Sequence, residues 1–242
     1  MTRLDIYLFE KKMFPTREKA KEAIMSGIIH KNGKLCTKAG ERVVETDNIE
    51  IVGQSLQYVS RAGLKLEKAQ KIWNIDFNNK VVLDVGASTG GFTDFAIKNG
   101  AKKVYSVDVG KGQLHESLKN NNKVVNMEKT DFRTMKPLKD KIDIAVCDCS
   151  FISLKLLCPK FIEVLTPNSI LITLIKPQFE CGKEIAKKNK GVLKDKSLQN
   201  SLKTEVINFY TQNGFNLCGE ATSPILGTQG NVEFLAYFTL QK

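Results

Sequence analysis

The chain has 242 residues, enough for one large domain or for a large and a small one. Its 37 Lys and Arg against 26 Asp and Glu give a formal net charge of +11, which favours a polyanionic partner such as nucleic acid. Charges interrupt its first 14 residues, which excludes a secretory signal. The most apolar run, 164–175, is too short for the ~20 residues that span a bilayer, so we expect a cytoplasmic protein without a transmembrane segment.

Residues 1–52 predict a small α+β module. Residues 3–13 carry apolar side chains at helical spacing, and residues 15–27 begin with proline and end with glycine, as a second short helix would. An Asn-Gly pair within 28–35 predicts a tight turn between two short strands, and the alternation of apolar and polar residues in 41–53 predicts another strand pair.

Residues 53–60 predict a short linker, and residues 61–242 alternate strands with helices, which is typical of a doubly wound α/β sheet. Two strands follow the last helix directly, so an antiparallel pair is expected at one edge of that sheet. The predicted strands are 80–86, 102–110, 123–128, 142–148, 169–175, 214–222 and 231–239, and the predicted helices are 92–100, 113–120, one from about 153 and one at 195–212.

Six cysteines, at positions 36, 147, 149, 158, 181 and 218, form no CxxC pair, and the chain has only two histidines. This spacing predicts neither a zinc site nor a small disulfide framework. We therefore expect reduced thiols, mostly buried, and no metal ion.

The stretch LDVGASTGGFTD, residues 83–94, predicts a buried strand that ends in a glycine-rich turn and opens a helix. Glycine lets the backbone turn tightly and approach a ligand, and the start of the helix offers unpaired N–H groups. Asp108, at the end of the next strand, could accept hydrogen bonds from ribose hydroxyls, as in dinucleotide and S-adenosylmethionine sites. Asp108 could equally cap the segment that follows it.

Two features favour S-adenosylmethionine over a dinucleotide. Ser88 stands at the second glycine position of the GxGxxG dinucleotide pattern and breaks it. Asp131 and Phe132 follow the third strand, where an acid and an aromatic ring could bind adenine, although Phe132 could equally belong to the core. The predicted cofactor-binding residues are Asp84, Gly86, Ser88, Thr89, Gly90, Gly91, Phe92, Asp108, Asp131, Phe132 and Asp148.

Charged residues are also predicted at the ends of apolar strands. Lys176 ends the run LITLIK, and Asp148 ends the strand before it, whereas Glu233 starts the last strand and Lys65 lies on the helix that leads into the domain. A lysine at a strand end often only extends into solvent. Because open α/β folds gather ligands at the carboxyl ends of their strands, these four side chains could instead converge on one site.

The first 52 residues resemble the alpha-L RNA-binding domain of a small-subunit ribosomal protein, pseudouridine synthases and tyrosyl-tRNA synthetases. The matching stretches are RLD at 3–5, TREKAKEAIMSGIIHKNGK at 16–34 and DNIEI at 47–51, with mild departures at Thr16 and at His30 and Lys31. The resemblance implies that cations of this module face RNA phosphates, although each could also belong to a solvated helix face. These cations are Arg3, Arg17, Lys19, Lys21, Lys34 and Lys38.

Nearly the whole chain resembles the TlyA family of rRNA 2′-O-methyltransferases, within the wider group that includes the FtsJ enzymes. The motifs are SRAGLKL, LDVGASTGGFTD, VDVGKGQL, DCSFISL, IKPQFECGKE, KGVLKD and SPILGTQGNVEFL. The resemblance implies a Rossmann-like sheet that binds S-adenosylmethionine and a Lys-Asp-Lys-Glu catalytic tetrad. Lys111 and Cys149 depart from the family pattern on the cofactor side. The tetrad maps onto Lys65, Asp148, Lys176 and Glu233.

The chemistry of a ribose hydroxyl accounts for such a tetrad. This hydroxyl is a poor nucleophile at neutral pH and needs a nearby proton acceptor, a role that a lysine fills only when its pKa is lowered. We favour Lys176 as the base, with Lys65 stabilising the developing oxyanion and the carboxylates positioning both lysines. The assignment of the base between the two lysines stays open at this point.

Most of the positive charge lies beyond residue 60, where 27 Lys and Arg stand against 18 Asp and Glu. The segment 183–196 alone holds six lysines and two acids, so it is either a solvated loop or a clamp on RNA. Further residues predicted to contact RNA are Arg61, Arg133, Lys183 and Lys187.

These observations predict methylation of a cytidine 2′-hydroxyl in ribosomal RNA, with ribosomal RNA or a ribosomal subunit as partner and no obligatory protein partner evident. The chain resembles the shorter members of its family, which suggests large-subunit (23S) rRNA as the target. A membrane-active haemolysin is one alternative, which liposome leakage would reveal. A non-catalytic RNA-binding assembly factor is the other, and calorimetry would identify it if S-adenosylmethionine failed to bind.

Overall fold

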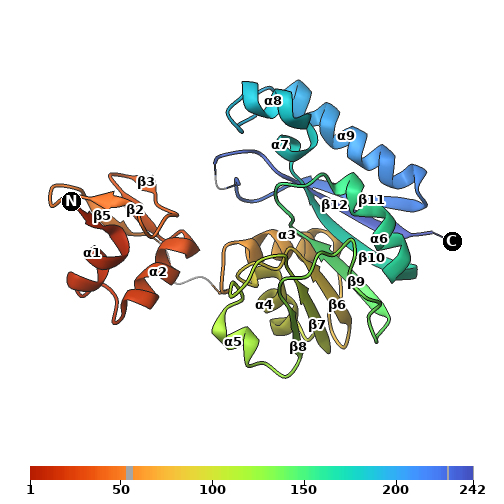
Figure 1. Ribbon diagram of the computed structural model, residues 1–242, viewed down its shortest axis with the longest axis horizontal. Helices are drawn as coiled ribbons and strands as arrows, with labels where there is room; N and C mark the ends of the chain where they lie inside the picture. The colour runs from red at the N-terminus through yellow and green to blue at the C-terminus, as the bar shows by residue number, and fades with distance from the viewer. Residues whose placement is uncertain (53–56, 228, 242) are drawn as a thin grey trace. The chain divides into compact units, whose positions relative to one another are not determined.

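A computed structural model describes residues 1–52, 57–227 and 229–241, without the side chains of Lys19, Glu22 and Ser26. The chain divides into two compact units, residues 1–62 and 63–242. Figure 1 shows the elements of both units, and it does not determine how the units are placed relative to one another. The linker at 53–60 stays a prediction, because residues 53–56 lie outside the described residues.

The first unit contains the two predicted helices, α1 (Leu4–Glu10) and α2 (Arg17–Ser26), packed through buried leucine, alanine and isoleucine side chains. The predicted hairpin is confirmed: β2 (Ile29–Lys31) pairs with β3 (Lys34–Leu35) across Asn32 and Gly33, which both have positive φ.

The strand pair predicted within residues 41–53 is wrong. Both strands form, but β4 (Arg42–Val43) pairs with β1 (Thr2–Arg3), and β5 (Ile49–Ile51) pairs with β2. Val43 is buried in the core of this unit, and the carboxylate of Asp47 accepts the N–H of Val44. β4 and β5 therefore belong to different sheets.

The second unit is built on a mixed sheet in the order β11-β12-β10-β9-β6-β7-β8. Its middle strands run parallel, and β12 runs antiparallel to both β10 and β11, which confirms the predicted antiparallel pair at one edge. The strands are β6 (Val81–Val85), β7 (Lys103–Val107), β8 (Val124–Met127), β9 (Ile142–Cys147), β10 (Leu165–Ile175), β11 (Phe215–Thr222) and β12 (Phe234–Leu240).

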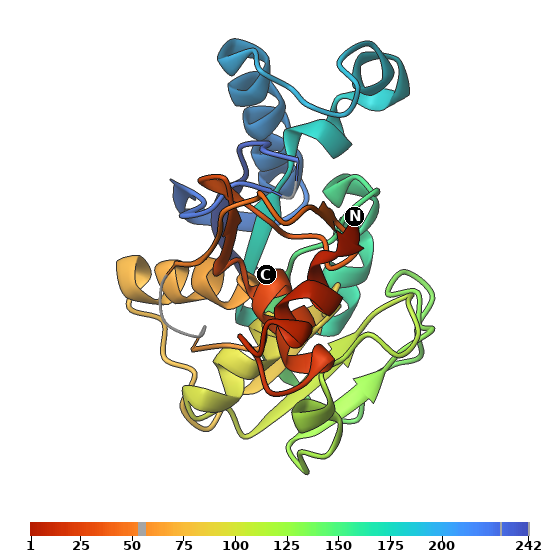
Figure 2. The same ribbon diagram turned by 90° about the vertical axis from the view of Figure 1, so that its left-hand side faces the viewer.

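Helices cover both faces of this sheet, and Figure 2 shows α3 and α6 on opposite sides of it. They are α3 (Ala62–Trp73), α4 (Gly91–Lys98), α5 (Glu116–Lys119), η1 (Leu154–Leu156), α6 (Cys158–Val164), α7 (Pro177–Glu180), α8 (Gly182–Lys188) and α9 (Lys196–Gln212). Three of them, η1, α6 and α8, differ from the sequence prediction. The helix expected from residue 153 is split into η1 and α6, with a proline in the first turn of α6, and part of the lysine-rich segment 183–196 is helical as α8.

One large hydrophobic cluster joins η1, α6 and α9 to the sheet. Tyr210 of α9 stacks on Phe238 of β12 at 5.2 Å between ring centroids, and its hydroxyl donates to the carbonyl of Leu154. This cluster fixes the strand ends whose loops carry the functional residues.

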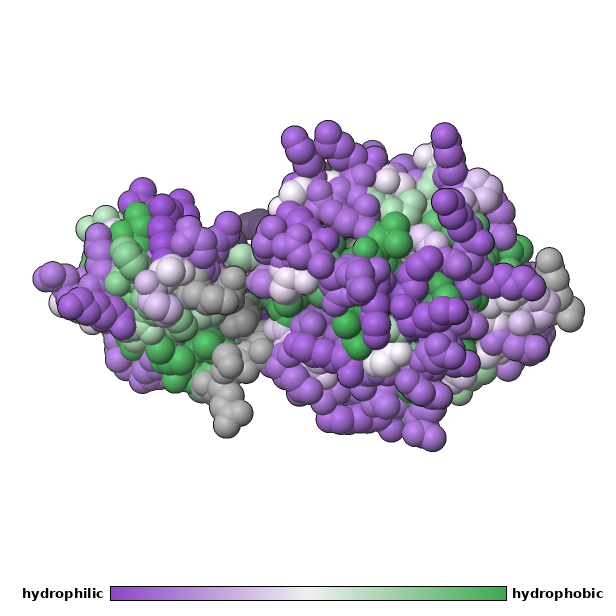
Figure 3. Space-filling model, turned by 90° about the horizontal axis from the view of Figure 1, so that it is seen from below, coloured by the Kyte–Doolittle hydropathy of each residue, from purple (hydrophilic) through white to green (hydrophobic). Residues whose placement is uncertain are grey.

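Two observations concern the helices and the surface. Among the described residues, no helix combines the length and the apolar character needed to cross a membrane. On the face shown in Figure 3, hydrophilic residues cover most of the larger unit and hydrophobic residues form small separate patches.

All six cysteines are free thiols, and four of them are buried.

Candidate active site

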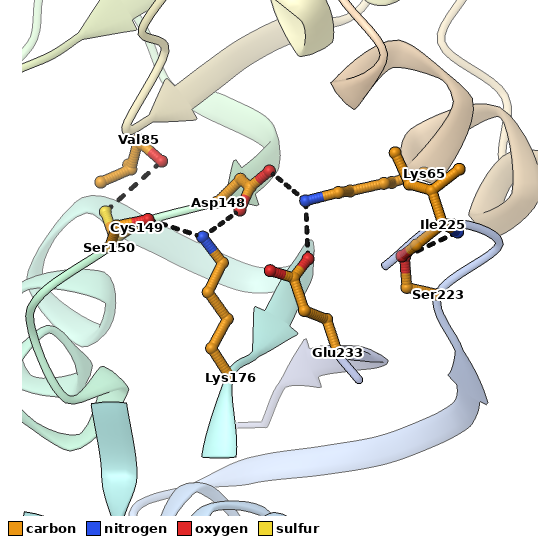
Figure 4. A network of polar contacts seen from close by, with 9 residues as sticks. All are labelled: Lys65, Val85, Asp148, Cys149, Ser150, Lys176, Ser223, Ile225 and Glu233. Carbon is orange, nitrogen blue, oxygen red and sulfur yellow. Dashed lines mark hydrogen bonds and ion pairs between the residues drawn. The ribbon is translucent and has the colours of Figure 1, made fainter. Parts of the chain in front are cut away.

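Four charged side chains converge at one edge of the sheet, where the parallel strands end (Figure 4). Asp148 directly follows β9, and Lys176 directly follows β10. Glu233 directly precedes β12, and because this strand is antiparallel, the pairing of Ile175 with Phe234 brings Glu233 to the same edge. Lys65 arrives from α3. The fold therefore brings together the four residues that the sequence predicted as a tetrad.

Lys65 is held by two carboxylates. Its Nζ donates to Oδ2 of Asp148 at 2.9 Å and to Oε2 of Glu233 at 2.7 Å. The side chains of Lys65 and Glu233 are only 9% and 4% exposed, so these are buried, charge-assisted hydrogen bonds.

Lys176 is held less completely. Its Nζ lies 2.7 Å from Oδ1 of Asp148 and donates to Oγ of Ser150 at 2.8 Å. Within the described part of the chain no aligned hydrogen bond reaches this Oδ1, so its contact with Lys176 is an ion pair without good donor geometry. Lys176 therefore has one carboxylate and one neutral partner, where Lys65 has two carboxylates.

The charges of this site follow from its contacts. Burial raises the pKa of Asp148, but the ammonium groups of Lys176 and Lys65 outweigh it and bring the pKa to about 2. Burial lowers the pKa of Lys65, and Asp148 and Glu233 together more than reverse this, so its pKa is raised above the usual value. At neutral pH, Asp148 is a carboxylate and Lys65 is an ammonium ion.

The glycine turn after β6 lies directly beside this cluster. Gly86 has a φ of +83°, and a Cβ there would lie 3.0 Å from the carbonyl oxygen of Asp148. Gly90, the N-cap of α4, has a φ of +96°, and its Cβ would lie 2.4 Å from a methyl carbon of Leu118. Only glycine fits either position without displacing its neighbours, so the conformation of this turn requires glycine at both positions.

Asp108 organises the adjacent loops. Its Oδ2 accepts the N–H of Ser88 at 2.8 Å, and its Oδ1 accepts the N–H of Gly110 at 2.7 Å. Each oxygen retains one further lone pair, so the carboxylate can still accept the two hydroxyls of a ribose. Asp108 thus makes the capping contacts that were its alternative role, and its binding of a ribose stays a prediction.

Asp84, at the end of β6, is a buried acid with one unused oxygen. The hydroxyl of Thr93 donates to its Oδ2 at 2.7 Å, and Oδ1 has no hydrogen-bond partner in the described chain. Burial raises the pKa of Asp84 to about 7, although Thr93 opposes the shift. An acceptor buried beside a glycine turn fits a cofactor that carries a cationic amino-acid group, as S-adenosylmethionine does.

Asp131 and Phe132 are placed differently from the sequence prediction. The carboxylate of Asp131 forms a bidentate ion pair with the guanidinium of Arg133, so the residues expected to contact adenine and RNA contact each other. Phe132 is 4% exposed and packs on Phe161 at 4.7 Å between ring centroids. Its ring belongs to the core, which was the alternative interpretation of this position, and its predicted stacking on adenine has no support from this placement.

The cations predicted to contact RNA lie on both units. Arg3 and Arg17 both bind the buried carboxylate of Asp5, while their own side chains are 43% and 49% exposed. Lys34, Lys38, Lys183 and Lys187 are exposed, the Arg61 side chain lies against Gly27, and the side chain of Lys19 lies outside the described residues.

Three side chains near Lys176 were not predicted from the sequence. Ser150 accepts its hydrogen bond, and Phe179 lies 5.8 Å from its Nζ at the ring centroid. Phe151 is 90% exposed, has a φ of +64° that is unusual for an aromatic residue, and lies 5.1 Å from the Phe179 ring. The signal in the sequence was an aromatic residue within the motif DCSFISL, three positions after Asp148, because exposure and φ cannot be read from the sequence.

This architecture defines a class of protein. A mostly parallel sheet with an antiparallel edge pair, a glycine turn after β6 and an acid after β7 is the Rossmann-like fold of S-adenosylmethionine-dependent methyltransferases. Residues 58–240 match the family described as FtsJ-like methyltransferase, and residues 2–49 match the S4 domain. The chain belongs to the FtsJ-like methyltransferase family, in its TlyA group.

Named relatives support this assignment. YqxC of Bacillus subtilis, provisionally named an rRNA methyltransferase, is 43% identical over 97% of this chain and 84% of its own length. The 23S rRNA (cytidine-2′-O)-methyltransferase TlyA of Campylobacter jejuni is 39% identical over 82% of this chain and 77% of its own. A solved structure from Streptococcus thermophilus, provisionally named a hemolysin, superimposes with a TM-score of 0.78 at 38% identity over 99% of this chain and 88% of that one. The predictions of the family and of the fold class are confirmed.

Proposed function

We propose that the protein methylates the ribose 2′-hydroxyl of a cytidine in ribosomal RNA, with large-subunit (23S) rRNA as the target. The observation that carries the proposal is the buried chain of ion pairs that links Lys176, Asp148, Lys65 and Glu233 beside the glycine turn. The S4 domain supports an RNA substrate, and the name of the Campylobacter relative supports cytidine in 23S rRNA. Such a substrate would place the activity in the cytoplasm.

S-adenosylmethionine, when bound, would supply the methyl group. Asp108 would accept hydrogen bonds from its ribose, Asp84 would receive its ammonium group, and the backbone at Gly86 and Gly90 would permit close approach. Asp131 and Phe132 are less suited to this role, because one is paired with Arg133 and the other is buried in the core.

Lys176 is the better candidate for the base. Lys65 remains an ammonium ion because two carboxylates bind it, so it is suited to donate to the oxygen on which negative charge develops. Among the described residues, Lys176 has one carboxylate partner, Asp148, and that contact is poorly aligned. In its neutral amine form, its Nζ would take the proton of the ribose hydroxyl. Asp148 and Glu233 would hold both lysines in place.

The direct test is transfer of tritiated methyl groups to purified ribosomal RNA and ribosomal subunits, with the modified nucleotide mapped in RNA from cells with and without the gene. We expect one cytidine of 23S rRNA to carry a 2′-O-methyl group only when the gene is present. Methylation of a base, or a map that does not change with the gene, would refute the proposal.

Phe151 is expected to stack on a base of the RNA beside Lys176, because its ring is almost fully exposed and is supported by Phe179. Such stacking contributes about 1–3 kcal/mol per base, so Phe151→Ala should lower kcat/KM for rRNA about 5- to 150-fold. Phe151→Tyr keeps the ring and should remain near the wild-type value. Equal kinetics for the alanine and tyrosine variants would exclude the stacking role.

The lysine-rich segment 183–196 is expected to bind RNA phosphates. Changing Lys183, Lys187 and Lys188 together to Gln should weaken rRNA binding and reduce its log–log salt slope by about 0.7–0.9 for each phosphate that is no longer neutralised. The control changes two lysines elsewhere to Gln, Lys71 and Lys98, which pair with Glu67 and Asp94 on their own helices. If both sets of variants keep the wild-type slope in a salt titration, the segment does not contact phosphates.

A further inference from the structure

Two buried side-chain amides hold the backbone in the middle of the lysine-rich segment 183–196. Asn231 accepts the N–H of Leu193 at 3.0 Å and donates to the carbonyl of Gly191 at 2.8 Å. Gln199 donates to the carbonyl of Leu193 at 2.7 Å. Asn231 and Gln199 are 4% and 6% exposed. Because buried amides with these hydrogen bonds are held rigidly, they fix the backbone of residues 191–193.

The hydrophobic contacts of Leu193 reinforce this anchor. Leu193 is 3% exposed and belongs to a small cluster with Cys181 and Leu202, which joins the start of α8 to α9. In contrast, all six lysines of the segment are exposed to solvent: Lys183, Lys187, Lys188, Lys190, Lys194 and Lys196. The segment thus presents cations on an anchored backbone, and Figures 1 and 2 both show α8 at the end of the unit where α9 begins.

The same asparagine lies two residues before Glu233, and this stretch is equally restrained. The N–H of Gly227 donates to the carbonyl of Asn231 at 2.9 Å, and the N–H of Ser223 donates to the carbonyl of Glu233 at 2.8 Å. A Cβ at Gly227 would lie 2.6 Å from Oε1 of Glu233, so the loop packs directly against this carboxylate. A shift of Asn231 would therefore move Glu233, and with it the hydrogen bond to Lys65.

We propose that Asn231 is a positioning residue that couples contact between RNA and the lysine-rich segment to the placement of Glu233 and Lys65. The proposal rests on the proposed function, because it takes RNA as the ligand of the segment and Lys65 as part of the reacting site. Phosphates that bind the lysines on either side of Gly191 and Leu193 would stiffen the backbone of the segment. Asn231 is the buried residue that connects this backbone to Glu233.

The first test compares Asn231→Ala with Asn213→Ala. Asn213 is an exposed amide that donates to a backbone carbonyl at the end of α9, so its loss removes a similar bond away from the site. Misplacement of a reacting group by about 1 Å can lower a rate 10²-fold, so Asn231→Ala should reduce kcat about 10- to 100-fold. Its affinity for S-adenosylmethionine should match the wild type, which shows that the domain is folded. An unchanged kcat would overturn the proposal.

The second test is a double-mutant cycle with Lys187→Gln and Lys188→Gln, because only coupling produces non-additive effects between separate positions. In the wild-type background, the two lysine changes should weaken rRNA binding and lower kcat. In the Asn231→Ala background, they should weaken binding by the same factor and leave kcat where Asn231→Ala has already brought it. Losses in kcat that multiply would show independent roles and would overturn the coupling.

Hydrogen exchange of the backbone amides separates this proposal from the proposed function, because it requires no methyl transfer. In Asn231→Ala, the amides of Leu193 and Ser223 should exchange faster, and rRNA should protect Ser223 in the wild type but not in the variant. This pattern in a protein that does not methylate rRNA would refute the proposed function alone. Equal protection of Ser223 by rRNA in both proteins would refute the coupling alone.

Discussion

Lys176→Ala should reduce methyl transfer to ribosomal RNA by about 10²- to 10⁴-fold, because it removes the group that takes the proton of the ribose hydroxyl. Cofactor affinity should change little, since Asp84 lies on β6 and Asp108 directly follows β7, whereas Lys176 follows β10. Single-turnover rates with saturating S-adenosylmethionine and rRNA would measure the effect. The matched control is Lys155→Ala, which removes a lysine of the neighbouring η1 helix that pairs with Glu205. Full activity in Lys176→Ala would end its assignment as the base.

Lys176→Arg distinguishes a base from a simple positive charge. Arginine keeps the charge beside Asp148, but its guanidinium stays protonated far above neutral pH and therefore cannot accept a proton. We expect the arginine variant to be nearly as inactive as the alanine variant. Substantial activity with arginine would instead show that the position only needs a cation.

Lys65 is a less informative position for the same test. Its removal would take the lysine partner from Glu233 and, among the ion pairs of the described chain, leave Asp148 with that of Lys176. Removing one partner of a buried ion pair typically destabilises a protein by about 3–5 kcal/mol, so a loss of activity in Lys65→Ala would combine unfolding with chemistry. Lys176→Ala also removes one partner of a buried ion pair, the one with Asp148, but it leaves both bonds of Lys65 and a second ammonium group beside Asp148 in place, so its effect on the rate is easier to interpret.

The four charged residues of the site could be predicted because each is tied to an apolar strand or to a helix whose pattern is local. Strands that run parallel place their ends at one edge, so the βα alternation indicated that Asp148 and Lys176 could lie close together. Glu233 required one more inference, an antiparallel last strand, and the adjacent strands 214–222 and 231–239 supplied it.

Other features depend on contacts between residues far apart in the chain, which no local pattern encodes. The strands near Val43 and Ile49 alternate as a hairpin would, yet each pairs with a different distant strand. The ring of Phe132 follows a strand end just as an adenine platform would, but packing on Phe161 buries it. Asn231 binds the backbone of Leu193, 38 residues earlier, and asparagine in a loop carries no signal of such a partner.

The buried carboxyl of Asp84 should make the stability of the ligand-free protein fall as the pH rises from about 4 to about 7. Its pKa in the folded chain is about 7, whereas an unfolded chain holds an aspartate near 3.9, so the folded state binds the extra proton within this window. Stability contributed by the neutral form is therefore present at low pH and lost as the carboxyl ionises, because no described residue donates to Oδ1.

Asp84→Asn cannot ionise and should lack this dependence. Between pH 5 and pH 8, the free energy of unfolding of the wild type should fall by about 2–3 kcal/mol more than that of the variant, measured by urea denaturation. Asp143→Asn is the control, because that acid is exposed at the start of β9 and accepts one backbone N–H, from Val81. Parallel pH profiles for the wild type and Asp84→Asn would mean that Asp84 is already ionised at pH 5 in the folded protein. In that case a donor outside the hydrogen bonds described for Asp84 would have to satisfy its buried oxygen.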